Sequence, residues 1–137
     1  MARRSARAAA VQMVYENMLG GDGGEDTLRG LIEFEPEGDD QEYIDRIVGG
    51  VAQKKDELDH LISGYLKDWT IDRIARVDLS ILRVSLYELL YETETHENIV
   101  CSEAVALAQR FSDENSGRFV NGVLGAFVRG RKTEETK

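Results

Sequence analysis

The sequence predicts an all-α fold of about seven helices joined by short connections. Apolar residues recur at helical spacing along most of the chain, and no segment shows the sustained alternation of apolar and polar residues that is typical of a half-buried strand. The single proline, Pro36, lies in an acidic stretch outside the strongest periodic segments. With 137 residues, 42% of them hydrophobic, the chain can form one core, arranged as one domain or as two small packed subdomains.

The first predicted helix covers residues 5–19. This segment is rich in alanine and contains neither glycine nor proline, which favours a helix. Its apolar stripe consists of Val11, Val14, Tyr15 and Met18. We expect the helix to end at the glycine cluster at 20–24, because glycine interrupts helices.

Two helices are expected before the middle of the chain. A short one at 27–34 would turn Leu28, Leu31 and Ile32 inward. A long one would follow at 40–66, with an apolar stripe that consists of Tyr43, Ile44, Ile47, Val48, Val51, Leu58, Leu61, Ile62 and Tyr65. At Gly49-Gly50 we expect either a bend or the close approach of a neighbouring helix.

Four more helices are predicted in the second half of the sequence. Thr70 is a suitable N-cap for a short helix at 71–76, and Asp78 is a suitable N-cap for a helix at 79–91. The helix at 79–91 is so densely apolar that we expect it to be central, with the others around it. The last two predicted helices cover residues 100–111 and 117–129, the second ending near Gly130.

The charge of the chain is unevenly distributed. The formal net charge is -9, yet residues 20–45 alone hold ten acidic residues against one base, Arg29. The acidity is therefore concentrated in one block, which we interpret as a solvated connection and not as a functional acidic tail. Because the block is local, the net charge does not exclude binding of a polyanion elsewhere on the surface.

A cluster of arginines opens the chain and is the first candidate site. Arg3, Arg4 and Arg7 precede any acidic residue and fall on the same side of the first helix as Val11 and Val14. Since arginines do not belong over a core, we expect the first turns to project beyond the bundle and expose their guanidinium groups. Three cations at a helix N-terminus also oppose the helix dipole, and an anionic partner would relieve that cost. RNA is the first candidate for this partner.

The sequence holds no recognisable catalytic motif. His60 and His96 lack a serine or cysteine nucleophile in a recognisable motif, and neither a phosphate-binding glycine loop nor a zinc-binding helix motif is present. We therefore expect no enzyme and no cofactor. The single cysteine, Cys101, can form no internal disulfide and suggests no metal site, so we expect the reducing cytosol and a small buried side chain in preference to a reactive thiol. We expect neither a secretory signal nor a membrane span, because no apolar run is long enough.

Two aromatic positions have alternative interpretations. Trp69 is interpreted as a packing anchor between subdomains in preference to a platform for a base. Phe119 could stack on a base, or it could make a hydrophobic contact that closes the start of its helix. Asn121-Gly122 lies inside a helical pattern, which suggests that another helix approaches closely there.

An ordered series of motifs resembles the NusB family of bacterial transcription antitermination factors, over most of the chain. The matching positions are Arg3-Arg4, Ala10-Val11-Gln12, Tyr15, Asp68-Trp69, Arg73-Ile74, Asp78, Ile81-Leu82-Arg83, Leu86-Tyr87-Glu88-Leu89, Glu103-Ala104-Val105, Leu107-Ala108 and Phe119-Val120-Asn121-Gly122-Val123-Leu124. No single motif is decisive, but the ordered series is highly specific.

The resemblance carries expectations of fold and function. It implies a single domain over residues 1–137, built from two small packed helical subdomains at about 1–67 and 68–137. It also implies binding of single-stranded boxA RNA from ribosomal RNA operons, together with the small-subunit ribosomal protein NusE. That pair is expected to join NusA, NusG and RNA polymerase and to suppress premature termination.

The resemblance further implies roles for individual residues. It gives the three arginines as phosphate contacts, and the other RNA-binding positions are Gln12, Tyr15, Tyr65, Phe119 and Asn121. The residues implied for the protein partner are Asp72, Arg76 and Asp78. Arg83 and Glu88 match the central helix and are either structural or partner-facing.

Two alternatives remain open at this point. A helical bundle with an acidic block could be a protein–protein interaction module that binds basic proteins and acts in ribosome assembly without direct RNA binding. It could also form a homodimer through the same surface.

Overall fold

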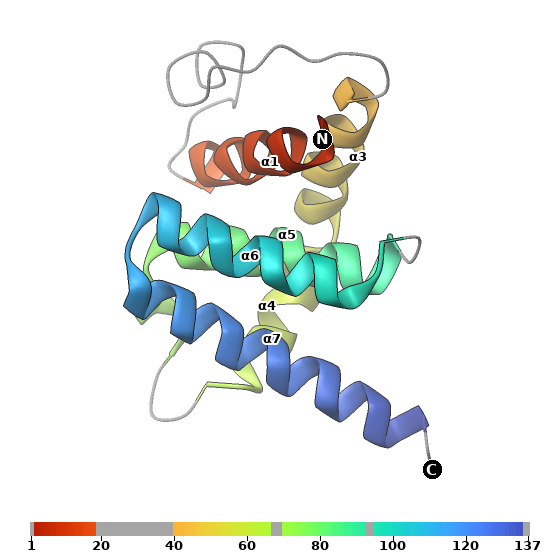
Figure 1. Cartoon of the computed structure of the whole chain (residues 1–137). Helices are drawn as coiled ribbons and strands as arrows, with labels where there is room; N and C mark the ends of the chain where they lie inside the picture. Colours follow the sequence, from red (N-terminus) through yellow and green to blue (C-terminus); the bar gives the residue numbers. More distant parts are fainter. Residues whose placement is uncertain (1, 19–39, 67–69, 93–94, 136–137) are drawn as a thin grey trace.

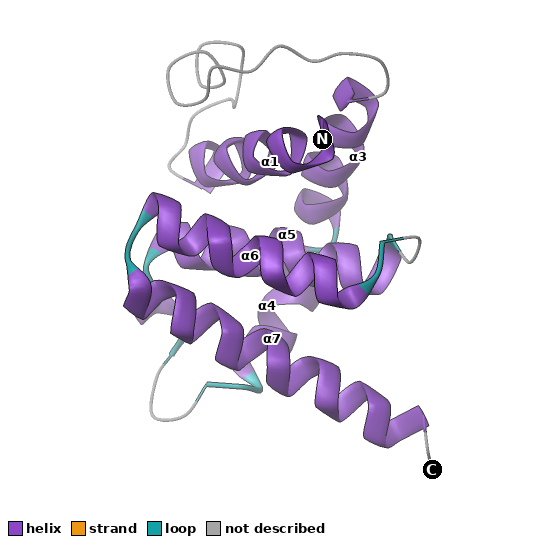
Figure 2. Ribbon diagram, in the orientation of Figure 1, coloured by secondary structure: helices purple, strands orange, loops and turns teal. Residues whose placement is uncertain are grey.

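A computed structural model of the chain describes residues 2–18, 40–66, 70–92 and 95–135, with the side chains of 2–5 and 132–135 excepted. These parts consist of helices joined by loops and turns, without a strand, as Figure 2 shows. The helices are α1 (Ala2–Met18), α3 (Asp40–Gln53), α4 (Lys55–Ser63), α5 (Arg76–Tyr91), α6 (Glu97–Phe111) and α7 (Glu114–Glu135), with a 3-10 turn η1 (Ile71–Arg73). The predicted all-α class is confirmed. The predicted helix at 27–34, the 67/68 subdomain boundary and Trp69 lie outside the described residues.

Helix α5 is the centre of the bundle, as its apolar density predicts. It packs against α1, α3, α4, α6 and α7. Figure 1 shows α1 on one side of the α5–α6 pair and α7 on the other, with α3 running from α1 towards α5. The fully buried apolar side chains come from several helices and include Ile44, Ile47, Leu58, Ile62, Ile81, Leu82, Leu86 and Leu124.

The prediction of one long helix at 40–66 is wrong, because this segment forms two helices. α3 ends at Gln53 and α4 starts at Lys55, so the break lies at Lys54 and not at the glycine pair. Gly50 instead admits a neighbour: a Cβ at this position would overlap the ring of Tyr87 on α5. Of the two outcomes expected at the glycine pair, close approach is the one the structure contains.

The prediction that Asp78 is an N-cap is also wrong, because Asp78 does not cap a helix. α5 begins two residues earlier, at Arg76, and Ala75 occupies the N-cap position without a side-chain hydrogen bond. The Asp78 carboxylate lies in the first turn and accepts a hydrogen bond from Ser116 Oγ of α7 at 3.3 Å. Thr70 precedes η1 but likewise makes no capping hydrogen bond.

The last two helices begin earlier than predicted, because side chains cap them. His96 Nδ1 accepts a hydrogen bond from the Asn98 backbone N–H, which starts α6 at Glu97. Asp113 Oδ1 accepts one from the Ser116 N–H, which starts α7 at Glu114. α7 also runs past Gly130, where Arg131 donates to the Leu89 carbonyl oxygen at 2.8 Å.

Candidate nucleic-acid interface

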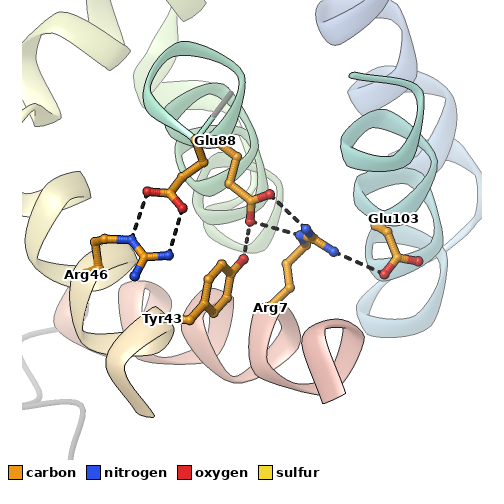
Figure 3. Close-up of polar contacts among 6 residues, drawn as sticks. Arg7, Tyr43, Arg46, Glu88 and Glu103 are labelled. Carbon is orange, nitrogen blue, oxygen red and sulfur yellow. Dashed lines mark hydrogen bonds and ion pairs between the residues drawn. The ribbon is translucent and has the colours of Figure 1, made fainter. Parts of the chain in front are cut away.

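Arg7 is buried, contrary to the prediction that it is exposed for a phosphate. The residue is 2% exposed. Its Nε and Nη2 donate to the two carboxylate oxygens of Glu88 on α5, at 2.9 and 2.8 Å, and its Nη1 donates to Glu103 on α6 at 3.2 Å. The hydroxyl of Tyr43 on α3 donates to the same Glu88 carboxylate. Figure 3 shows these contacts joining four helices.

The electrostatics of Arg7 fit a structural ion pair. Burial alone would lower the pKa of the guanidinium, but the hydrogen bond and negative charge of Glu88 outweigh burial, and the pKa is raised. Removing one partner from such a buried pair leaves an uncompensated charge, which costs about 3–5 kcal/mol of stability. Arg7 is therefore unavailable to a phosphate in this fold, and its assignment as a phosphate contact is corrected.

The error at Arg7 has a clear physical reason. The expectation placed no arginine over a core, whereas the core here supplies two carboxylates that match the guanidinium fork. The side chains of Arg3 and Arg4 lie outside the described ones, so their predicted role stays a prediction.

A cavity lies where α1, α5 and α6 meet, beyond the Arg7 contacts along α1. Its volume is about 230 Å³, and its lining residues are Val11, Gln12, Tyr15, Val77 and Phe111. Gln12 is buried and Tyr15 half-buried, and they are the two residues with polar groups in an otherwise apolar lining. An aromatic and apolar hollow with an amide and a phenol can stack on a base and hydrogen-bond to its edge.

A second cavity lies near the first one. Its volume is about 450 Å³, and its lining residues are Arg73, Ile74, Ala75, Asp78, Ser112, Asp113, Asn115, Ser116 and Phe119. Asp78 and Ser112 directly follow Val77 and Phe111 of the first cavity in the chain, so the two cavities lie near each other. Both therefore lie at the end of the bundle where α5 begins and α6 ends (Figure 1).

Asp78 gives the second cavity an acidic character. The residue is 6% exposed, and its Oδ1 has no hydrogen-bond partner among the described residues. Burial raises the pKa of the carboxyl, the Ser116 hydrogen bond opposes that rise, and the charge of Asp113 adds to it. A buried carboxylate oxygen without a partner favours a hydrogen-bond donor from outside the chain, and a basic side chain supplies one.

The remaining predicted residues are dispersed. Phe119 packs against the core and also lines the second cavity. Asn121 is exposed on α7, and Asp72 and Arg76 are exposed beside the second cavity, in η1 and at the start of α5. Tyr65 lies elsewhere, where its ring meets Phe127 edge-on with centroids 6.3 Å apart.

Sequence reasoning missed two contributors to these cavities. Phe111 walls the first cavity, with the guanidinium of Arg110 5.3 Å from its ring centroid. Ser116 bonds to Asp78 in the second cavity, and Asp113 is an N-cap residue that could have located the start of this helix. Arg83 and Glu88 both bond to other helices of the chain: Glu88 accepts from Arg7, and Arg83 donates to both oxygens of Asp59 at 2.8 Å.

Other site chemistries find little support in the described parts of the chain. No group of three or more His, Cys, Asp or Glu residues there is arranged to hold a metal ion. No helix in those parts is long and apolar enough to cross a membrane. Cys101 is a free, half-buried thiol whose pKa is raised, first by burial and further by Glu97, against a lowering by Arg131.

Known proteins with similar sequence or fold agree with the motif series. A relative from Clostridium botulinum named transcription antitermination protein NusB is 36% identical over 141 residues, which cover 93% of this chain and 100% of the relative. A chain in a crystal structure of the antitermination factors NusB and NusE in complex with dsRNA has a TM-score of 0.82 at 28% identity, covering 94% of this chain and 97% of that one. A T. maritima NusB structure has a TM-score of 0.81 at 32% identity, covering 93% of this chain and 90% of that one.

These likenesses extend over nearly the whole chain and include both cavities. The profile of the NusB family matches residues 4–129, from the arginine-rich start to the second half of α7. The chain therefore belongs to the NusB family.

Proposed function

We propose that this chain is a non-catalytic RNA-binding transcription antitermination factor that works together with NusE. The observation that carries the proposal is the full-length likeness to relatives of that name and to a protein chain crystallised with NusE and RNA. Both cavities of the candidate interface lie within the matched region. The proposed place of action is the cytoplasm, where bacterial transcription takes place.

The proposed interface divides its work between two kinds of contact. Arg3 and Arg4 contact phosphates, which gives affinity without sequence information. Gln12 and Tyr15 contact a base or a sugar in the first cavity, and Phe119 and Asn121 extend the RNA path along α7. Tyr65 would touch only RNA that continues to the far half of α7, where it packs on Phe127.

NusE is proposed to occupy the acidic second cavity at Asp78, while Phe119, which also lines this cavity, is assigned to the RNA. The unpartnered Oδ1 of Asp78 accepts a hydrogen bond from a basic side chain of the partner. Asp72 and Arg76 flank the cavity from exposed positions and supply rim contacts. The RNA is proposed to be a single-stranded boxA element of ribosomal RNA operons, and the larger complex to contain NusA, NusG and RNA polymerase.

The proposal is tested by fluorescence anisotropy with a labelled boxA-like RNA, at two salt concentrations, with and without NusE. We expect binding that tightens with NusE and weakens with salt. Two phosphate-binding arginines on single-stranded RNA contribute about -1.4 to the slope of log K against log salt, at about -0.7 each. The variant R3A/R4A should lose that part of the slope while its circular dichroism stays unchanged.

Two outcomes would contradict the proposal. Absence of RNA binding under both conditions, with the protein still helical, would leave a protein–protein interaction module that acts in ribosome assembly. The unpaired Asp78 oxygen is the observation that favours this second candidate. A concentration-dependent dimer that loses its NusE affinity would indicate that the same face serves self-association.

A further inference from the structure

The Arg7 contacts add directional bonds to the part of α1 that otherwise packs through small side chains. The buried face of α1 around Arg7 consists of Ala6, Ala8, Ala9 and Ala10, each at most 1% exposed. Alanine allows two helices to approach closely, but it provides no long side chains to interlock with a neighbour and fix rotation or register. The directional bonds of the guanidinium fork supply that constraint.

The same contacts link α1 to α6. α1 packs chiefly on α3 and α5, whereas the bond from Arg7 to Glu103 reaches α6 directly. Figure 3 shows the fork of Arg7 between Glu88 on α5 and Glu103 on α6. α1 and α6 are thus related in two ways, through their common packing on α5 and through this direct polar link.

The first cavity depends on that relative position. α1 and α6 run in the same direction (Figure 1), and their contributions to the cavity, Tyr15 and Phe111, each lie eight residues after Arg7 and Glu103. At 1.5 Å per residue, the fork and the far wall of the cavity are about 12 Å apart along both helices. A rotation or slide of α1 at the fork displaces Gln12 and Tyr15 against Phe111.

From this geometry we infer that Arg7 is a positioning residue for RNA binding: through Glu88 and Glu103 it sets the cavity between α1 and α6 that receives a base. The inference rests on the proposed function and deepens it. Under this inference Arg7 does not contact a phosphate but acts on RNA binding indirectly, through the position of α1.

Removing the negative charge of Glu103 distinguishes the two possible roles of Arg7, phosphate contact and positioning of α1. If Arg7 contacted phosphate, replacing Glu103 by glutamine would remove a nearby negative charge and strengthen RNA binding. If Arg7 positions α1, the same change weakens the Arg7–Glu103 bond and weakens RNA binding. One substitution therefore gives opposite signs under the two hypotheses.

The experiment measures anisotropy of labelled boxA-like RNA with the full chain and NusE, for E103Q and R7K. We expect both variants to bind roughly 2- to 30-fold more weakly than the wild type, the range observed for residues that act through a coupled network. Their salt slopes should equal that of the wild type, because no phosphate contact is lost.

A matched control is available in the Arg83–Asp59 pair. It is also bidentate, with both bonds at 2.8 Å, and it joins α5 to α4. Neither cavity of the candidate interface includes Asp59. We expect D59N to retain RNA affinity within about twofold, while it loses about as much stability as E103Q does.

Hydrogen exchange of the α1 amides at residues 11–15, measured without RNA, separates the inference from the proposed function. Faster exchange there in E103Q, but not in D59N, supports positioning by Arg7. Unchanged exchange, or RNA binding by E103Q as tight as wild type, would overturn the inference. A wild type that binds no RNA would overturn the proposed function, and the exchange result would still decide whether Arg7 positions α1.

Discussion

At the scale of single residues, Asp78 combines a cost in stability with a place in the candidate interface. Its carboxyl is buried beside an open cavity, one oxygen is held only by Ser116, and the other has no partner among the described residues. Burial of a charge that is incompletely hydrogen-bonded destabilises a fold. A binding partner that donates to this oxygen would offset the cost, so stability and binding are expected to oppose each other here.

The variant D78N tests this opposition. We expect its free energy of unfolding at neutral pH to rise by about 1 kcal/mol, as is common when a strained functional residue is replaced. NusE affinity should fall, because the amide lacks the charge that attracts a basic side chain. Urea unfolding and NusE titration measure the two effects.

The pH dependence of D78N follows from the raised pKa of Asp78. A carboxyl whose pKa is higher in the folded state than its ordinary 3.8 binds its proton more tightly when folded. Its contribution therefore costs stability fully above the folded pKa, and the cost disappears as the pH falls towards 3.8. The stability gain of D78N should shrink over that window, and a gain of equal size at neutral and acidic pH would argue against a titrating origin.

At the scale of helices, the pattern of apolar residues predicts which helices exist and in what order more reliably than it predicts where each helix begins and ends. The central position of α5 could be predicted because its apolar residues face all directions. The ends could not, because they depend on side-chain bonds such as those of His96 and Asp113 to nearby backbone groups. The apolar stripe skips one turn here, from Val51 to Leu58, but a skipped turn does not by itself distinguish a break at Lys54 from a continuous helix.

Gly49 and Gly50 give a matched test of packing between α3 and α5. A Cβ at Gly50 would overlap the Tyr87 ring, whereas a Cβ at Gly49 would meet nothing within 4 Å. We expect G50A to destabilise the protein by about 1–3 kcal/mol through overpacking. G49A should stabilise it by up to about 1 kcal/mol, because alanine favours a helix over glycine.

Thermal or urea unfolding of the two variants provides the measurement. Opposite signs at adjacent positions would show that helix packing, and not helix propensity, determines the effect at Gly50. If G50A were as stable as G49A, the close approach of Tyr87 would have to be abandoned.

At the scale of the whole molecule, the sequence predicts less of the site than of the fold. Arg7 lies 81 and 96 residues from the carboxylates that bury it, and no local pattern reports such distant partners. An arginine with apolar neighbours on one helix face therefore looks like an exposed ligand contact. Cavities pose the same difficulty, since Tyr15, Val77 and Phe111 meet only when three helices pack.

Added salt should raise the stability of this protein and lower its affinity for RNA. The net charge of -9 adds repulsion among like charges to the folded state, and added salt screens this repulsion. Exposed ion pairs such as Arg46–Glu92 oppose this trend, but each is worth only about 0–1 kcal/mol. The buried Arg7–Glu88 pair is screened much less.

We therefore expect moderate salt to raise the free energy of unfolding by about 1 kcal/mol, which corresponds to a rise of roughly 4 °C in Tm. Over the same range RNA affinity should fall, because salt competes with the local arginine contacts regardless of net charge. Calorimetry and anisotropy on one salt series measure both effects. A Tm that falls with salt would mean that surface ion pairs outweigh the acidic block. An RNA affinity independent of salt would mean that the cavities, without phosphate contacts, provide the binding.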